Sequence, residues 1–196
     1  SFMAQLEGSA NTFQVPATTA TQTGPATATW AMDGTGVVTN YCLYSEQFDN
    51  AAWGSLSGGT ATANTAVAPD GTTTADTINC AVVYRGLGQP TALAATVGAT
   101  YTFSVYLAGT VGQTCRIRVA NTTGTVTAAT TDVTLTAAFA RYSATVTLAG
   151  GATGVMDCWV AREAGQTAAS FYAWGAQLEL AAAASTYVAT TSAATN

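Results

Sequence analysis

The sequence predicts an all-β protein, a jelly-roll β-sandwich preceded by an extended N-terminal arm. Short runs that alternate apolar and polar residues fill most of the chain, and Gly, Pro, Asn and Asp separate them as turn formers. No segment has a sustained apolar period of 3.6 residues, so we expect no long helix. The chain contains 42 Ala and 38 Thr. Thr favours half-buried strands, and about eight short strands with regular turns are typical of a sandwich or jelly roll.

Composition divides the chain into three parts. Residues 1–39 contain only two charged residues and have runs of Thr, Ala, Gln and Pro. Pro16 and Pro25 prevent a continuous helix there, so we expect an extended arm, either ordered against a neighbour or serving as a flexible linker. We expect residues 40–191 to form the sandwich and residues 192–196 to form a C-terminal tail.

A segment early in the sandwich pairs two aromatic residues across a turn. Phe48 and Trp53 are expected to pack over one end of the sandwich. Between them, Asp49 or Asn50 is expected to cap the turn.

Three central segments, 101–107, 115–119 and 141–148, alternate clearly enough to assign their faces. In the second of them the alternation directs Arg116 and Arg118 outward. The side chains expected to face the core are Tyr101, Phe103, Val105, Leu107, Cys115, Ile117, Val119, Tyr142, Ala144, Val146 and Leu148.

The last predicted strand spans residues 171–180. Uninterrupted alternation would place Trp174 and Leu178 towards the core, with Gly175 allowing another backbone or ring to approach closely. The side chains expected on that one side are Tyr172, Trp174, Leu178 and Leu180.

Missing residue types exclude several kinds of chemistry. The chain has no His, and its five positive charges are all arginines. It therefore has no Ser-His-Asp or Cys-His catalytic arrangement, no histidine metal ligand and no lysine Schiff base. Ten acidic residues remain, but nothing in the sequence pairs two of them across a cleft, so we expect no enzyme activity.

Charge and hydropathy also limit the expected partners. A net charge of −5 and scattered arginines argue against nucleic-acid binding, which needs a basic patch. The uncharged stretches 8–32 and 86–115 lack the roughly 20 consecutive apolar residues of a membrane span. The N-terminus lacks the pattern of a signal peptide, so we expect neither membrane insertion nor Sec export.

Four cysteines, Cys42, Cys80, Cys115 and Cys158, are widely spaced, which fits neither a zinc site nor a dense disulfide framework. Each lies within a predicted strand, where a free cysteine acts as a small buried hydrophobe. The alternative is a disulfide between two of them.

Five motifs in fixed order resemble a known group, the carbohydrate-binding-module-like jelly-roll domains of tailed-bacteriophage virion proteins. Such domains occur in capsid decoration proteins, head fibres and tail fibres. The resemblance covers about residues 40–191. The motifs are YSEQFDNAAW at 44–53, APDGTTTAD at 68–76, YTFSVYL at 101–107, WGAQLE at 174–179 and STYVATT at 185–191.

The resemblance implies a virion structural protein, a capsid decoration or cement protein or a head-fibre protein. Such a protein would bind the major capsid protein or other virion subunits through its arm and sandwich base, as a homotrimer on the outer surface of the capsid or on the tail. The alternative is a tail-fibre or host-recognition module that binds cell-surface glycan. A secreted bacterial sugar-binding module is a third hypothesis, which the missing export signal disfavours.

A glycan site would need exposed aromatic faces beside planar polar side chains. The alternative interpretation of the same rings is a second core layer or an oligomer contact. The candidate glycan-binding residues are Trp53, Tyr84, Arg85, Tyr106, Arg116, Arg118 and Trp159.

Sugar-binding relatives often carry a structural calcium ion, so the resemblance also implies a calcium site. Glu46, Asp49 and Glu179 offer the oxygen ligands that calcium prefers, although no clustered Asp-x-Asp loop is present. No other cofactor is expected.

Overall fold

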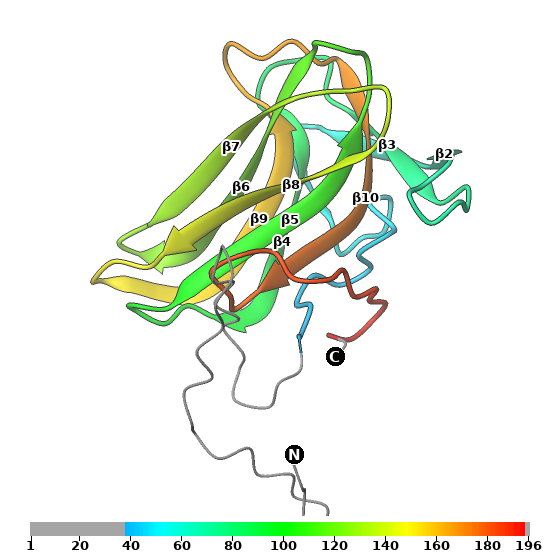
Figure 1. Ribbon diagram of the computed structural model, residues 1–196. Coiled ribbons are helices and arrows are strands. Elements are labelled where there is room, and N and C mark those ends of the chain that lie inside the picture. The colour runs from blue at the N-terminus through cyan, green and yellow to red at the C-terminus, as the bar shows by residue number, and fades with distance from the viewer. Residues whose placement is uncertain (1–37, 195–196) are drawn as a thin grey trace, which may run out of the picture.

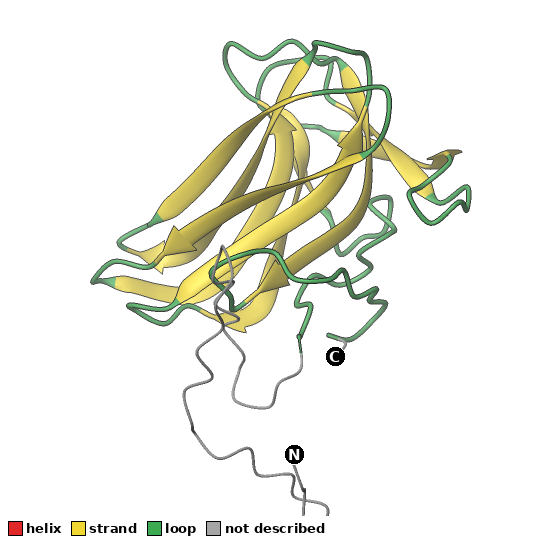
Figure 2. Ribbon diagram, viewed as in Figure 1, coloured by secondary structure: helices red, strands yellow, loops and turns green. Residues whose placement is uncertain are grey.

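The computed structural model describes residues 38–194, which form two antiparallel five-stranded sheets packed face to face (Figures 1 and 2). Almost all of the expected arm, 1–39, and the last two residues of the expected tail, 192–196, lie outside the described residues. The first sheet has the order β1 (Gly54–Leu56), β4 (Arg85–Ala94), β9 (Ala152–Arg162), β6 (Thr114–Gly124), β7 (Ala128–Thr134). The second has the order β2 (Thr60–Ala66), β3 (Ala75–Asn79), β10 (Ser170–Glu179), β5 (Thr100–Ala108), β8 (Ala140–Thr147).

The chain crosses repeatedly between the two sheets, as the jelly-roll prediction requires. β5, β8 and β10 belong to the second sheet, whereas β4, β6, β7 and β9 belong to the first. Along one side the sheets meet where β7 contacts β8: the Thr131 hydroxyl donates to the carbonyl of Ser143 (2.8 Å), and the Tyr142 hydroxyl to the carbonyl of Thr134 (3.1 Å). Within the described residues, no helix is long and apolar enough to cross a membrane.

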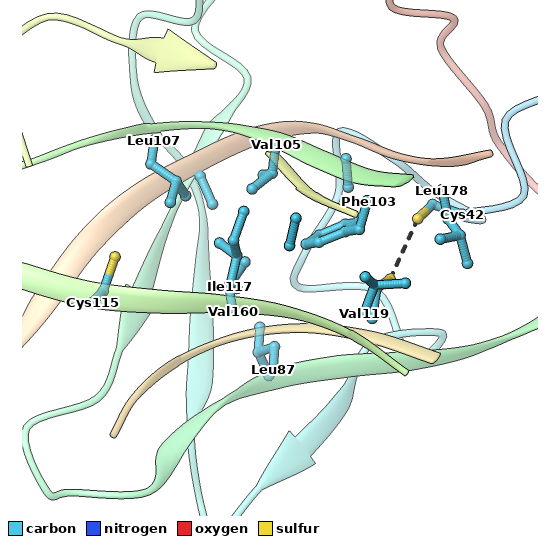
Figure 3. Packing of buried hydrophobic residues seen from close by; sticks show 14 of the residues in the cluster. Cys42, Leu87, Phe103, Val105, Leu107, Cys115, Ile117, Val119, Val160 and Leu178 are labelled. Carbon is cyan, nitrogen blue, oxygen red and sulfur yellow. Dashed lines mark hydrogen bonds between the residues drawn. The ribbon is translucent and has the colours of Figure 1, made fainter. Parts of the chain in front are cut away.

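The core fills the space between the sheets (Figure 3). Phe103, Val105 and Leu107 of β5 face Ile117 of β6 and Val160 of β9 across it, and all five are fully buried. Burying such a side chain contributes about 1.5–3 kcal/mol. The faces predicted for the strands at 101–107, 115–119 and 141–148 are therefore confirmed. Within these sets, Tyr142 alone is only partly buried.

The prediction for the last strand is wrong in part, because β10 contains a bulge. Its pairing with β5 shifts register between Trp174 and Gln177, where Gly175 adopts a positive φ of 64°. One extra residue reverses the alternation. Leu178 consequently packs in the core between the sheets, whereas Trp174 is buried on the opposite face. The other two residues expected on that side, Tyr172 and Leu180, are exposed.

The turn that precedes β1 forms as the sequence predicts. The Phe48 and Trp53 rings lie 4.4 Å apart between centroids, and Asn50 Oδ1 accepts a hydrogen bond from the backbone N–H of Ala52 (3.0 Å). Asn50 is thus the residue that caps the turn. Asp76 of β3 holds the same segment, because its Oδ2 accepts from the backbone N–H of Phe48 (2.6 Å).

The bulge leads to a stability prediction for Gly175. A Cβ there would lie 3.1 Å from the ring of Tyr106, whereas a Cβ at Gly165, which also has a positive φ, would meet open space. Both Gly175→Ala and Gly165→Ala should lower the free energy of unfolding by about 1–2 kcal/mol, because a residue with a Cβ is strained in the left-handed conformation. Only Gly175→Ala should lower it further, because its Cβ would crowd the Tyr106 ring, and urea denaturation measures the difference. Equal free energies of unfolding for the two variants would contradict this close contact.

Candidate functional site

The outer face of the second sheet is covered by the chain itself. Residues 181–191, which we call the C-terminal strap, lie across β5 and β10 (the red segment in Figure 1). Gln177 Oε1 accepts from the backbone N–H of Val188 (2.8 Å), and the Glu179 carboxylate accepts from the backbone N–H (3.0 Å) and hydroxyl (2.6 Å) of Ser185. The strap therefore covers the part of β10 that carries Gln177 and Glu179, whereas Tyr172 near the start of the strand is exposed.

Asn40 fastens the strap to the sandwich. Its Nδ2 donates to the carbonyls of Ala176 (2.9 Å) and Val188 (2.8 Å), and its Oδ1 accepts from the backbone N–H groups of Cys42 (3.0 Å) and Leu178 (3.2 Å). The side chain is fully buried and uses both of its polar atoms. One amide thereby joins the N-terminal segment, β10 and the strap.

An aromatic cluster beneath the strap accounts for one candidate glycan residue. Tyr106 packs against Trp174 (5.6 Å between centroids) and against Tyr187 of the strap (6.2 Å). The Arg141 guanidinium lies 5.5 Å from the Tyr106 ring centre and donates to the Ser104 hydroxyl (2.8 Å). Tyr106 thus belongs to a second core layer, which was the alternative interpretation of this ring.

The outer face of the first sheet presents a tryptophan beside glycines. Pairing across the strands produces one row, Gly54 on β1, Gly88 on β4, Trp159 on β9, Arg118 on β6 and Thr130 on β7. Trp159 and Arg118 are half-buried, and the Arg118 guanidinium carbon lies 5.6 Å from the centre of the indole. Gly54 is exposed, whereas Gly88 is buried, because the side chains of Trp159 and Leu56 lie against it.

Asp157 occupies the next row on the same face, two residues before Trp159. Its Oδ1 is buried and has no hydrogen-bond partner. Burial raises the pKa of this carboxyl, and the nearby charge of Arg118 opposes that shift. A buried acceptor without a donor costs free energy, so this carboxyl is an unfavourable group within an otherwise hydrogen-bonded sheet.

On the other side of Trp159, Arg116 makes a bidentate ion pair with Asp132. Its Nε lies 2.6 Å from Oδ1 and its Nη2 lies 3.2 Å from Oδ2. Gln166 Nε2 also donates to Asp132 Oδ1 (2.9 Å). The hydrogen bond from Arg116 lowers the pKa of Asp132, so the pair stays ionised. The ion pair fixes the Arg116 guanidinium beside the cross-strand row that contains Trp159.

We call the surface formed by Gly54, Gly88, Arg118, Asp157 and Trp159 the Trp159 face. Three of the seven candidate glycan residues, Arg116, Arg118 and Trp159, lie on or beside it. Asp157 was missed by the sequence analysis. The signal was available, because residues two apart on a strand share a face and Asp157 precedes Trp159 by two.

The remaining candidates lie elsewhere. Trp53 is only 4% exposed and donates its indole N–H to the carbonyl of Tyr44 (3.1 Å), so its expected exposure is wrong. Tyr84 is 56% exposed, in the turn that precedes β4. Arg85 donates its Nε to the carbonyl of Ser57 (3.1 Å) at the end of the sheet.

The three calcium candidates have separate roles. Glu46 accepts from the Tyr187 hydroxyl (3.1 Å), Glu179 is held by the strap, and Asp49 is exposed. Across residues 38–194 no group of three or more Cys, Asp or Glu side chains is placed to hold a metal ion. The three carboxylates suit calcium chemically, but the described residues do not gather them into the one site that the resemblance implies.

Comparison with known proteins supports the fold. No protein-family model and no curated protein sequence matches the chain. Among solved structures, it is similar to the CBM22-1–GH10 modules of Clostridium thermocellum xylanase 10B complexed with xylohexaose, with a TM-score of 0.53 and 15% identity over 74% of this chain and 28% of that one. It is also similar to the CBM22-1 xylan-binding domain of Paenibacillus barcinonensis Xyn10C, with a TM-score of 0.52 and 11% identity over 76% of this chain and 97% of that one.

A third similar structure comes from a phage. The enzymatically active domain of tailspike protein 4 from bacteriophage CBA120 has a TM-score of 0.51 and 13% identity, over 71% of this chain and 21% of that one. The chain thus spans between a fifth and a third of the tailspike and xylanase chains. Together these similarities support the jelly-roll sandwich fold.

The pKa of Asp157 leads to a prediction about pH. Because its folded-state pKa is raised, the folded protein retains a proton that the unfolded chain loses as pH rises above the ordinary value of 3.8. The wild type should therefore lose stability relative to Asp157→Asn between that pH and the raised pKa. Thermal unfolding at about pH 3 and about pH 7 measures this difference.

Asp132→Asn is the matched control. The pKa of Asp132 is lowered, so its contribution to stability is present at neutral pH and is lost as pH falls through the lowered pKa. This variant should be less stable than the wild type at about pH 7. Two variants with the same pH dependence would contradict the assignment of Asp157 as an unpartnered buried carboxyl.

Proposed function

We propose that this chain is a glycan-binding module and that its site is the Trp159 face. The observation that carries the proposal is the grouping of an aromatic ring, a partnerless carboxylate oxygen and a guanidinium on an open sheet face. On the opposite sheet the strap covers β10 at Gln177 and Glu179, and the exposed ring of Tyr172 has no guanidinium packed against it in the described residues. The proposal is one of binding without catalysis.

The expected binding mode follows from the rows of the sheet. A pyranose would place its apolar C–H face on the half-buried indole of Trp159, beside the Arg118 guanidinium. Its hydroxyls would accept from Arg118 and donate to the Asp157 carboxylate, whose Oδ1 would become accessible through a change of the side-chain rotamer. A hydrogen bond to a charged group contributes about 1.5–3 kcal/mol, so one sugar would bind weakly, and several linked copies would be needed for firm attachment.

The similar structures support this proposal without deciding it. One was solved with xylohexaose bound and another is described as a xylan-binding domain. The similarity to a phage tailspike domain is consistent with the sequence resemblance to virion proteins. It favours the alternative of a tail-fibre or host-recognition module over capsid decoration, for which the described residues offer no specific observation.

Location on a virion, a capsid-protein partner and a homotrimer remain predictions of the sequence resemblance. They are compatible with glycan binding, because trimeric presentation would supply the multivalency that a weak site needs. Cosedimentation with capsids that lack the protein would test the capsid partner directly.

The Trp159 face leads to a binding prediction. A glycan array of plant xylans and bacterial surface polysaccharides should identify a ligand, and calorimetry with the matching oligosaccharide should measure its affinity. Trp159→Ala should weaken binding at least tenfold, on the order of 1.4 kcal/mol, because the stacking surface is lost. Asp157→Asn should weaken it less, because the amide still presents an acceptor oxygen.

Tyr84→Ala is the matched control, since Tyr84 is an exposed aromatic residue outside the Trp159 face. It should bind with wild-type affinity. Unchanged binding by Trp159→Ala, a loss caused by Tyr84→Ala, or the absence of any glycan ligand on the array would each overturn the proposal.

A further inference from the structure

Two cysteine thiols that are far apart in the sequence meet inside the core. The sulfur atoms of Cys42 and Cys158 lie 3.5 Å apart, and both residues are 0% exposed (dashed line in Figure 3). Cys42 lies in the N-terminal segment that precedes β1, and Cys158 lies in β9, a central strand of the first sheet. The pair therefore connects parts of the fold that are separated by 116 residues.

Both cysteines have fixed backbones. The N–H of Cys42 is held by Asn40 Oδ1 (3.0 Å), and its carbonyl accepts from the Thr190 hydroxyl. Cys158 is paired on both sides, with Gln89 of β4 and Val119 of β6. The two thiols are thus held in contact by the fold itself, and the bond requires the sulfurs to approach from 3.5 Å to about 2.05 Å.

We propose that Cys42 and Cys158 form a structural disulfide when the chain folds in an oxidising medium. The reaction needs a disulfide oxidant such as oxidised glutathione. One cysteine thiolate attacks the oxidant, forming a mixed disulfide and releasing one glutathione thiolate. The second cysteine thiolate then attacks the protein sulfur of that mixed disulfide and displaces the other glutathione. Two cysteine thiols are oxidised, one glutathione disulfide is reduced, and the two thiol protons end on the two glutathione products.

Burial determines when this bond can form. No oxidant reaches a pair with no exposed surface, and burial raises the pKa of the Cys158 thiol well above 9, which leaves almost no thiolate in the folded protein. The bond must therefore form during folding. Protein that folds reduced should keep both thiols, and protein that folds oxidised should keep the bond against reduction.

The other two cysteines serve as an internal comparison. The Cys80 thiol donates to the carbonyl of Ala168 (3.4 Å), and burial raises the pKa of Cys80 to about 11 and that of Cys115 to about 12. Among the described residues, neither Cys80 nor Cys115 has a thiol–thiol hydrogen bond like the contact between Cys42 and Cys158. We expect Cys80 and Cys115 to remain reduced under conditions that join Cys42 to Cys158.

Peptide mapping tests the pairing. The denatured, reduced chain is refolded in a glutathione redox buffer and then unfolded in denaturant that contains N-ethylmaleimide, which blocks every free thiol, and it is cut after Arg and Glu. This digestion separates all four cysteines into the peptides 8–46, 47–85, 86–116 and 142–162. A cross-link between 8–46 and 142–162, with Cys80 and Cys115 blocked, is the expected result. Blocked Cys42 and Cys158, or a different cross-link, would overturn the proposal.

Thermal unfolding tests the consequence. Closing a loop of more than 100 residues should raise the Tm of the oxidised protein by roughly 10 °C over the reduced protein. Cys42→Ala should abolish this difference, and Cys80→Ala should retain it. Adding oxidised glutathione to the folded reduced protein should leave its Tm unchanged. Equal Tm values for the oxidised and reduced wild type, or a rise in Tm on adding oxidant to the folded protein, would contradict the inference.

Discussion

The arrangement of this sandwich depends on a buried polar network that fastens the C-terminal strap to β10. The bulge at Gly175 directs Gln177 and Glu179 to the outer face of the second sheet, where both become buried. A buried amide or carboxylate without partners would cost several kcal/mol, so these side chains are stable there only because Ser185 and Val188 supply hydrogen bonds. Closure of this face is therefore a consequence of the bulge.

Because the strap covers part of the second sheet, the outer faces of the two sheets differ chemically. Along β10, the second sheet uses its aromatic residues to anchor the strap, with Tyr187 packed 4.9 Å from Trp174. The first sheet leaves Trp159 beside glycine backbone and a carboxylate oxygen without a donor. Within residues 38–194, each face has one buried polar side-chain atom without a hydrogen-bond partner, Arg141 Nε on the strap face and Asp157 Oδ1 on the Trp159 face. Arg141 donates to the strap itself, at the carbonyl of Ser185, whereas no described chain segment of this kind lies over Trp159. Recognition of an external molecule is therefore best sought on the first sheet.

Local alternation was enough to predict the strands at 101–107 and 141–148, because a two-residue period with one buried face has a single consistent assignment. It failed at 171–180, because a bulge depends on pairing with β5, which is distant in sequence. For the same reason the sequence could not separate buried Trp53 from half-buried Trp159. The glycines beside Trp159 come from β1 and β4, and only strand pairing brings them together.

The position of the Trp159 face within the sheet bears on how well it can discriminate between ligands. Trp159 lies on β9 and Arg118 on β6, and each strand is paired on both sides. The neighbours of Trp159 in sequence, Cys158 and Val160, are fully buried in the core. Groups held in this way lose little conformational freedom on binding, so even a few contacts can contribute to affinity and selectivity. The exposed turn at Tyr84 lacks this support, and for that reason the centre of the first sheet is the better candidate for specific recognition.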